Sequence, residues 1–467
     1  MTTTTLDRPQ HTPEFRRRRG VNWMSLGMLY AFFYATRYNY TAAAPYLAKT
    51  LGWRNTELGI FETMMPLVYG LAVVFNGPFA DRVGGKKAFL WGAAGVAAMN
   101  LLFGLASLAV VSPAVWAGEG LAKHVTTPAV LGFGLSGGML LAMMAVVWGI
   151  NGYFQSFGAL SIVKVNAQWF HVRERGTFAG IFGVLIRFGL LLAFYGVPLI
   201  FLVFPWQYAF WIPGACVVVF LLVNLKWMEN SPKDAGLGEF DTGDDVDPSD
   251  SPLAIGDIIR KVFASPTMWT IAAASMMIGF VRRSVVDAWW PKYLVDVYGA
   301  DQAHFATYAP YMIAAWGIAL SGITGGFAFG IASDRTFGGR RAPVITFGFI
   351  GMAVLLALFG VSDRMGLGPV AAAWWLVALS FCVNGAHGMI GGAASMDFGG
   401  RKAAASAAGL FDGMQYLAGA FVGLGVGYVT TTWGWDAWHW APIPFAIVGA
   451  LLMSRLWNVL PKGRSGH

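Results

Sequence analysis

Residues 26–47 read LGMLYAFFYATRYNYTAAAPYL, an apolar and aromatic segment that carries one arginine, Arg37, near its middle. An arginine at the centre of a membrane helix costs roughly 2.5–3.5 kcal/mol on insertion scales, so a chain keeps one where it faces a cavity or a partner. Tyr30 and Tyr34 precede Arg37 on the same helical face. Snorkelling to the lipid surface is the alternative, but about a dozen apolar residues lie on the cytoplasmic side of Arg37. We predict that phenol hydroxyls and a guanidinium form an anion-binding face.

The composition is that of an integral membrane protein. Of the 467 residues, 56% are hydrophobic and 12% are charged, against about 25% charged in soluble domains. We predict an all-α membrane protein with twelve transmembrane helices. The expected spans are 24–45, 58–80, 87–108, 128–156, 177–203, 206–226, 267–290, 305–333, 343–362, 369–393, 404–431 and 438–459. The two cysteines fit no disulfide or metal pattern, and the +8 net charge is scattered through short loops, so we expect no metal, cofactor or nucleic acid.

The basic residues follow one side of this topology. They cluster before the first span, after the second, fourth, eighth and tenth spans, and at the end of the chain, whereas the opposite loops carry few. The positive-inside rule therefore predicts a multi-pass protein of the cell (inner) membrane with both termini in the cytoplasm.

The sequence divides into two similar halves. Asp81-Arg82 in the loop after the second span matches Asp334-Arg335 after the eighth, 253 residues later (334 − 81). We expect two pseudo-symmetric six-helix bundles joined by an acidic linker. The expected parts are a tail at 1–22, bundles at 23–228 and 266–460, a linker at 229–265 with a short surface helix near 255–263, and a tail at 461–467.

The repeat also gives Arg37 a counterpart. Nearly the same offset leads from Arg37 to Arg282 and Arg283 in the seventh span. Two arginines from equivalent helices would meet near the midplane, where they repel unless an anion joins them. Planar guanidinium groups suit phosphate or carboxylate, so the predicted substrate is an anion with more than one negative charge.

The repeated loop, Asp81-Arg-Val-Gly-Gly85 in the first half and Asp334-Arg-Thr-Phe-Gly-Gly339 in the second, resembles the signature of the major facilitator superfamily. Further motifs resemble the organophosphate:phosphate antiporters, which include the glycerol-phosphate and hexose-phosphate transporters. These motifs are Tyr34-Ala-Thr-Arg37-Tyr-Asn, Arg173-Glu174-Arg175-Gly176, Ser231-Pro232-Lys-Asp234-Ala-Gly236-Leu237 and Trp289-x-Pro291-x-Tyr293-Leu294. The resemblance implies the major facilitator fold, and it implies that Arg37 and one of Arg282 or Arg283 grip a phosphoryl group.

The choice between the two seventh-span arginines depends on the reference point. Counting from Pro291 selects Arg283, which we favour, whereas counting from Asp287 selects Arg282. The other arginine is expected to pair with Asp287, because an unpaired charge there would be costly.

The rest of the cavity departs from the family pattern. Val73 stands where the family has a lysine, and Ile186 stands where it has a histidine. Other side chains are expected to line the cavity and select the organic part of the substrate: Tyr30, Tyr34, Gln155, Arg187, Asn384, His387 and Tyr416. A separate group of charged residues is expected to serve gating and structure: Asp81, Arg82, Glu174, Arg175, Asp287, Asp334 and Arg335.

We expect a monomeric secondary transporter and not an enzyme. It would exchange a small phosphorylated organic anion for inorganic phosphate across the lipid bilayer by alternating access. The alternatives are a carboxylate or nitrate transporter, with proton coupling through Asp287, Glu62, Asp412 or His387, a phosphate-ester sensor of the same fold, and a lipid scramblase or flippase.

Overall fold

The computed structural model describes residues 11–108, 137–171, 174–242 and 264–459. Helices make up this part of the chain, and it contains no β-strand. The start of the fourth predicted span, the expected helix near 255–263, and most of the acidic linker lie outside the described residues.

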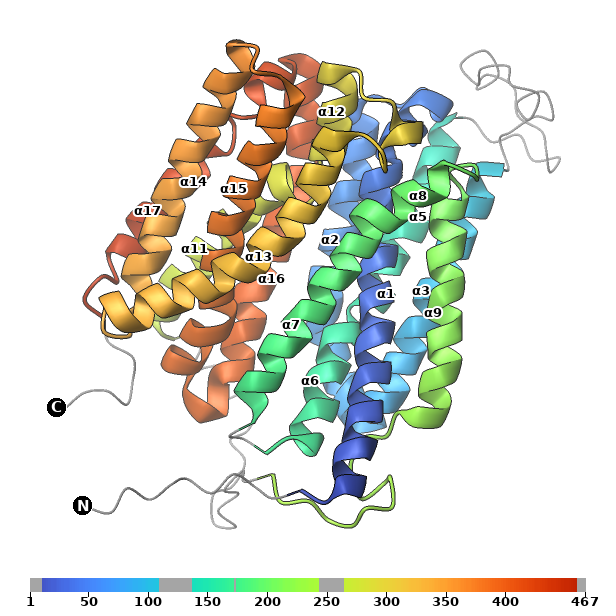
Figure 1. The fold of residues 1–467 in the computed structure, drawn as a ribbon, viewed down its shortest axis with the longest axis vertical. Helices are drawn as coiled ribbons and strands as arrows, with labels where there is room; N and C mark the ends of the chain where they lie inside the picture. The colour runs from blue at the N-terminus through green and yellow to red at the C-terminus, as the bar shows by residue number, and fades with distance from the viewer. Residues whose placement is uncertain (1–10, 109–136, 172–173, 243–263, 460–467) are drawn as a thin grey trace.

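The first half forms one bundle (Figure 1). Its helices are α1 (Pro13–Leu51), α2 (Asn55–Val83), α3 (Gly85–Leu108), α5 (Gly137–Gln155), α6 (Phe157–Trp169), α7 (Arg175–Leu191), the π-helical turn η2 (Leu192–Gly196), α8 (Val197–Phe201) and α9 (Tyr208–Trp227). The helices α5 and α6 follow each other along one span, as do α7, η2 and α8.

The second half forms the other bundle. Its helices are α11 (Pro266–Val281), the π-helical turn η3 (Arg282–Val286), α12 (Trp290–Tyr298), the 3₁₀ turn η4 (Gln302–His304), α13 (Ala309–Thr336), α14 (Arg341–Arg364), α15 (Gly368–Gly388), the π-helical turn η5 (Met389–Ala394), α16 (Ser395–Thr432), the 3₁₀ turn η6 (Trp435–Ala437) and α17 (Ile443–Ser454). Every predicted span falls on one of these helices or on helices that follow each other, apart from its undescribed residues.

Seven helices in the described part of the chain are long and apolar enough to cross a membrane. The helix α1 is outside this set because Arg37, Asn39 and the neighbouring tyrosines lower its hydropathy. These polar side chains are buried inside the protein. The helix α1 carries Arg37, the first predicted site residue. Its buried polar side chains therefore depend on partners within the protein.

Local signals at the helix ends agree between the halves. Thr12 accepts a hydrogen bond from the backbone N of Phe15 at 3.2 Å at the start of α1, and Ser265 caps α11 in the same way. Gly52 and Gly299, in the left-handed region with φ of 69° and 63°, end α1 and α12. The equivalent spans of the two halves thus share their terminating signals.

The two halves meet mainly at one end of the bundle. The start of α1 and the end of α17 lie at the same end, which we call the terminal face; the opposite end is the loop face (Figure 1). Near the loop face α2 packs closely along α16, with a hydrogen bond from Asn55 to Thr430 and one from Thr63 to the Ala420 carbonyl.

The apolar core follows the same division. One cluster of buried residues spans both halves, with Phe194 of the first half packed edge-on against Trp290 of the second. A second cluster, which includes Leu26, Phe33 and Trp169, draws only on the first half. The hydrogen bonds from Arg37 to Tyr416, from Arg187 to Asn384 and from Asn55 to Thr430 join the halves between the loop face and the middle of the spans.

We predict that Gly423→Ala destabilises the protein by disturbing the α2–α16 contact. A methyl group at this position would clash with the backbone nitrogen of Thr63, and overpacking of this kind costs about 1–3 kcal/mol. The measurement is the melting temperature of the detergent-purified protein. Gly425→Ala is the matched control, because nothing lies within 4 Å of a methyl group there. Equal melting temperatures for the two variants would contradict the assigned contact.

Candidate functional site

Arg37 lies buried at the centre of the described fold, with 5% of its surface exposed. Its Nε and Nη2 donate to the Gln155 side-chain oxygen at 3.3 and 3.2 Å. Its Nη1 donates to the Tyr416 hydroxyl on α16, in the other half, at 3.0 Å. A guanidinium held by neutral acceptors keeps its full positive charge, so this position favours an anion.

Aromatic rings enclose the same guanidinium. The Arg37 Cζ lies 4.8 Å from the ring centroids of both Tyr34 and Tyr69, and Tyr69 stacks on Tyr416 with centroids 4.1 Å apart. Tyr30 packs edge-on against Tyr34 at 5.3 Å. Tyr34 therefore meets Arg37 through its ring face, whereas the sequence analysis expected its hydroxyl. The sequence analysis did not name Tyr69.

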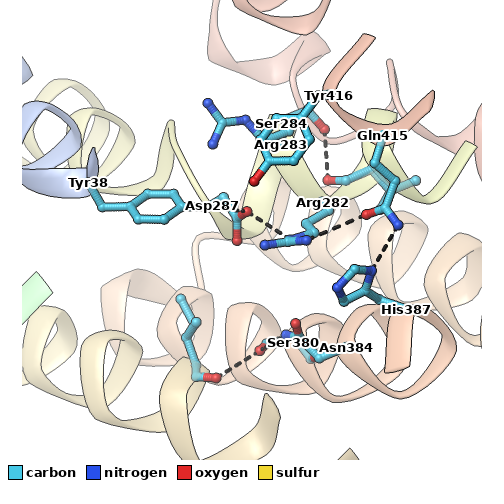
Figure 2. Close-up of polar contacts among 12 residues, drawn as sticks. Tyr38, Arg282, Arg283, Ser284, Asp287, Ser380, Asn384, His387, Gln415 and Tyr416 are labelled. Carbon is cyan, nitrogen blue, oxygen red and sulfur yellow. Dashed lines mark hydrogen bonds and ion pairs between the residues drawn. The ribbon is translucent and has the colours of Figure 1, made fainter. Parts of the chain in front are cut away.

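The two seventh-span arginines occupy different environments in the π-helical turn η3 (Figure 2). Arg282 Nε lies 2.8 Å from an Asp287 carboxylate oxygen, which also accepts a hydrogen bond from the Tyr38 hydroxyl at 3.3 Å. This is the pairing expected for one of the two arginines. Arg283 instead donates through Nη2 to Glu62 of α2 at 2.8 Å.

The Arg283–Glu62 pair crosses between the halves. Arg283 also lies over the Tyr38 ring at 5.8 Å and packs against Gly419 of α16. Glu62 accepts a second hydrogen bond, from Thr41 at 3.2 Å. The sequence analysis named Glu62 only for proton coupling and did not predict it as the partner of Arg283.

A third cation, Arg187 of α7, reaches across to α15. Its Nη2 donates to the Asn384 side-chain oxygen at 2.7 Å, and Asn384 is fixed by donating to Ser380. Gly322 of α13 makes room for this arginine, because a methyl group there would lie 2.6 Å from the Arg187 Cζ. The predicted side chains Arg187 and Asn384 are therefore brought together.

His387 joins the site through Gln415, another residue that the sequence analysis did not name. The Gln415 side-chain nitrogen lies 2.8 Å from the His387 Nδ1, and it also donates to Ser275 at 3.0 Å. Figure 2 shows Gln415 between Arg282 and His387. The oxygen of Gln415 accepts from Arg282 at 3.5 Å, so this glutamine links the histidine to the η3 turn.

The charges of this central group do not cancel within its ion pairs. Arg282 and Arg283 each have a carboxylate partner, whereas Arg37 and Arg187 form no ion pair among the described residues. Both instead donate to neutral groups. Asp412, on the exposed surface of α16, is the remaining acidic residue of this region. The arrangement suits a ligand that carries negative charge to more than one arginine.

The predicted gating residues pair within each half. Arg19 donates to Glu174 at 2.8 Å, and His11 lies 3.1 Å from it; burial alone would raise the pKa of the Glu174 carboxyl, but these partners lower it. In the second half Arg341 donates to Asp334 at 2.8 Å.

The structure shows less of the other predicted gating residues. Arg82 and Arg335 are exposed, and the side chains of Asp81 and Arg175 lie outside the described part. A role of these residues in closing the terminal face stays a prediction.

A sequence model described as Major Facilitator Superfamily matches residues 26–423. The chain belongs to the Major Facilitator Superfamily. It is therefore a multi-pass membrane transporter of the superfamily's helical fold rather than an enzyme.

Curated relatives span nearly the whole chain. The chain is 25% identical to the "Probable hexose phosphate transport protein" of Chlamydia trachomatis, over 97% of this chain and 95% of that protein. It is 26% identical to the glycerol-3-phosphate transporter of Bacillus subtilis, with the same coverage of each. It is 23% identical to the membrane sensor protein UhpC of Escherichia coli, over 92% of this chain and 90% of that protein.

Solved structures agree in fold. The chain is similar to the xylose transporter XylE of E. coli in a partially occluded inward-open conformation, with a TM-score of 0.68 and 14% identity over 97% of this chain and 100% of that chain. It is similar to a bacterial homologue of the human lysosomal transporter Spinster, with a TM-score of 0.67 and 13% identity over 96% and 98%.

We predict that Arg37→Lys weakens anion binding at least about tenfold while the protein stays folded. A lysine is a point charge on a flexible stem and cannot reproduce the planar fork that spans Gln155 and Tyr416. The measurement is a titration of the purified protein with inorganic phosphate, together with its melting temperature. Arg364→Lys, at an exposed arginine of the loop face, is the matched control. Phosphate affinity near that of the control would refute the assigned role.

Proposed function

We propose that the protein exchanges a small phosphorylated organic anion, such as a sugar phosphate or glycerol phosphate, for inorganic phosphate. The observation that carries this proposal is the buried Arg37, held by neutral partners at the junction of the two halves. The named substrates of the relatives support the choice of a phosphorylated ligand. The phosphoryl group is common to both exchanged anions, so one set of arginines serves both.

Arg37 and Arg283 hold the phosphoryl group in this proposal. They come from equivalent spans of the two halves, α1 and η3, and Tyr38 lies beside Arg283. Planar guanidinium groups bind phosphoryl oxygens in pairs, which fixes orientation as well as charge. We assign Arg282 a mainly structural role, because it pairs with the buried Asp287 of its own half, whereas Arg283 reaches across the junction to Glu62 of the other half.

The remaining side chains select the organic part of the substrate. Tyrosine and asparagine side chains can form hydrogen bonds with hydroxyl groups on the organic part of the substrate. The arginines hold the phosphoryl group, which is the same in every substrate. The lining residues are Tyr30, Tyr34, Gln155, Arg187, Asn384, His387 and Tyr416.

The distribution of contacts between the halves supports alternating access. Contacts gather near the loop face, where α2 crosses α16, so the described arrangement is the one that opens toward the terminal face. We place the termini in the cytoplasm, which makes this the inward-open state of a monomer in the cell's inner membrane. Rocking of the two bundles about the bound anion opens the other side.

We predict obligatory exchange. A carrier that crosses without an anion keeps Arg37 and Arg187 desolvated without an ionic partner, which disfavours the occluded state. The measurement is uptake of labelled phosphate into proteoliposomes that are empty, loaded with phosphate, or loaded with glycerol 3-phosphate. Loaded vesicles should take up several-fold more label than empty ones. Equal uptake into empty and loaded vesicles would contradict exchange.

The same assay separates the alternatives. Two arginines favour a dianion, so competition by a phosphate ester should strengthen as pH rises through its second ionisation, near about pH 6. Inhibition by dicarboxylates but not by phosphate esters would move the protein to the carboxylate class. Binding of phosphate esters without any uptake would instead favour a sensor, the role named for the relative UhpC.

We predict that Arg283→Ala abolishes phosphate binding, whereas Arg282→Ala mainly lowers stability. Removing Arg282 leaves the buried Asp287 carboxylate without its cation, and breaking a buried pair typically costs about 3–5 kcal/mol. Phosphate titration and melting temperature, measured on both variants, separate the two roles. Loss of binding in Arg282→Ala with binding intact in Arg283→Ala would reverse the assignment.

A further inference from the structure

Glu62 is a buried carboxylate on a helix that otherwise contributes packing to the site. It belongs to α2 of the first half, it is 8% exposed, and one of its oxygens lies 2.8 Å from the Arg283 Nη2 of the second half. Its other oxygen accepts from Thr41. Both oxygens are therefore engaged, and the acidic group lies directly on the cation that the proposed function gives to the phosphoryl group.

We propose that Glu62 is a resident counter-ion of Arg283, which the phosphoryl group of the substrate displaces. This inference rests on the proposed function, because it takes a phosphorylated anion as the ligand. Glu62 occupies one N–H donor of Arg283 and already supplies that guanidinium with negative charge, so it competes with a phosphoryl group for the same cation. Glu62 is thus a positioning residue that sets how tightly the anion binds.

Glu62 has polar neighbours other than Arg283. Glu62 lines a small cavity together with Tyr40, Trp289 and Lys292. The Thr41 hydroxyl donates to Glu62, and the Lys292 ammonium, which is paired with Asp296, lines the same cavity. Thr41 and Lys292 are therefore the groups that we expect to accompany a carboxylate displaced from Arg283.

The position of the pair connects ligand binding to movement of the halves. The next residue, Thr63, bonds to Ala420 across the α2–α16 contact, and Arg283 packs against Gly419 of the same helix. The Glu62–Arg283 pair is thus one of the bonds that hold the loop face together. A phosphoryl group that takes Arg283 from Glu62 removes this bond at the moment of binding, which favours opening of the loop face.

The test compares the full-length wild-type protein with Glu62→Gln. Without the competing carboxylate, the variant should bind inorganic phosphate at least about tenfold more tightly, equivalent to about 1.4 kcal/mol. Its melting temperature should be lower than that of the wild type without phosphate, and phosphate should raise it by more than it raises the wild type. Glu57→Gln is the matched control, because Glu57 is on the same helix and pairs with Arg54 at the loop face.

Glu62→Asp provides a second variant that keeps the charge but shortens the reach to Arg283, so it should show the same gain in affinity to a smaller extent. A purely structural role would lower the melting temperature equally with and without phosphate, and would leave the affinity unchanged. Unchanged or weaker phosphate binding in both variants overturns the inference. If the wild type itself binds neither phosphate nor phosphate esters, the proposed function has failed instead.

Discussion

The constraint on which this structure depends is the cost of a guanidinium that cannot reach water. Arg37 lies at the centre of α1, and the groups that accept its hydrogen bonds are neutral: the Gln155 side-chain oxygen and the Tyr416 hydroxyl. A neutral acceptor satisfies the hydrogen-bond donors but leaves the charge unbalanced. The second half presents the opposite solution, because Arg282 and Arg283 are each balanced by a carboxylate. The site therefore carries positive charge on Arg37 and Arg187 without an ion-pair partner among the described residues, and the proposed anion would balance it.

The same groups hold the two bundles together. Arg37 bonds to α16, Tyr38 bonds to Asp287, and Arg283 bonds to Glu62, so three of the central contacts join one half to the other. A ligand that competes for any of these side chains also acts on the junction between the halves. In the proposed function, binding and movement are linked because they use the same hydrogen bonds.

The sequence predicted the architecture and part of the site. Span positions follow from apolar runs that must cross a bilayer, and the repeated Asp-Arg loop reveals the duplication. Arg37 could be predicted as a site residue because an arginine within an apolar membrane span is costly unless it faces a cavity or a partner. The partners Tyr69 and Gln415, and the pairing of Glu62 with Arg283, were not predicted, because they depend on how α2 and α16 cross. The π-helical turn η3 adds a further limit, since its wider turn changes which residues share a face after Arg283.

The central claim is that one phosphoryl group bridges the two halves through Arg37 and Arg283. The most direct test is an experimental structure of the protein bound to a non-hydrolysable phosphonate analogue of a sugar phosphate. The account predicts phosphonate oxygens within hydrogen-bond distance of both guanidinium groups, with the Glu62 carboxylate withdrawn from Arg283. Phosphonate bound away from Arg37, with the Glu62–Arg283 pair intact, would contradict it.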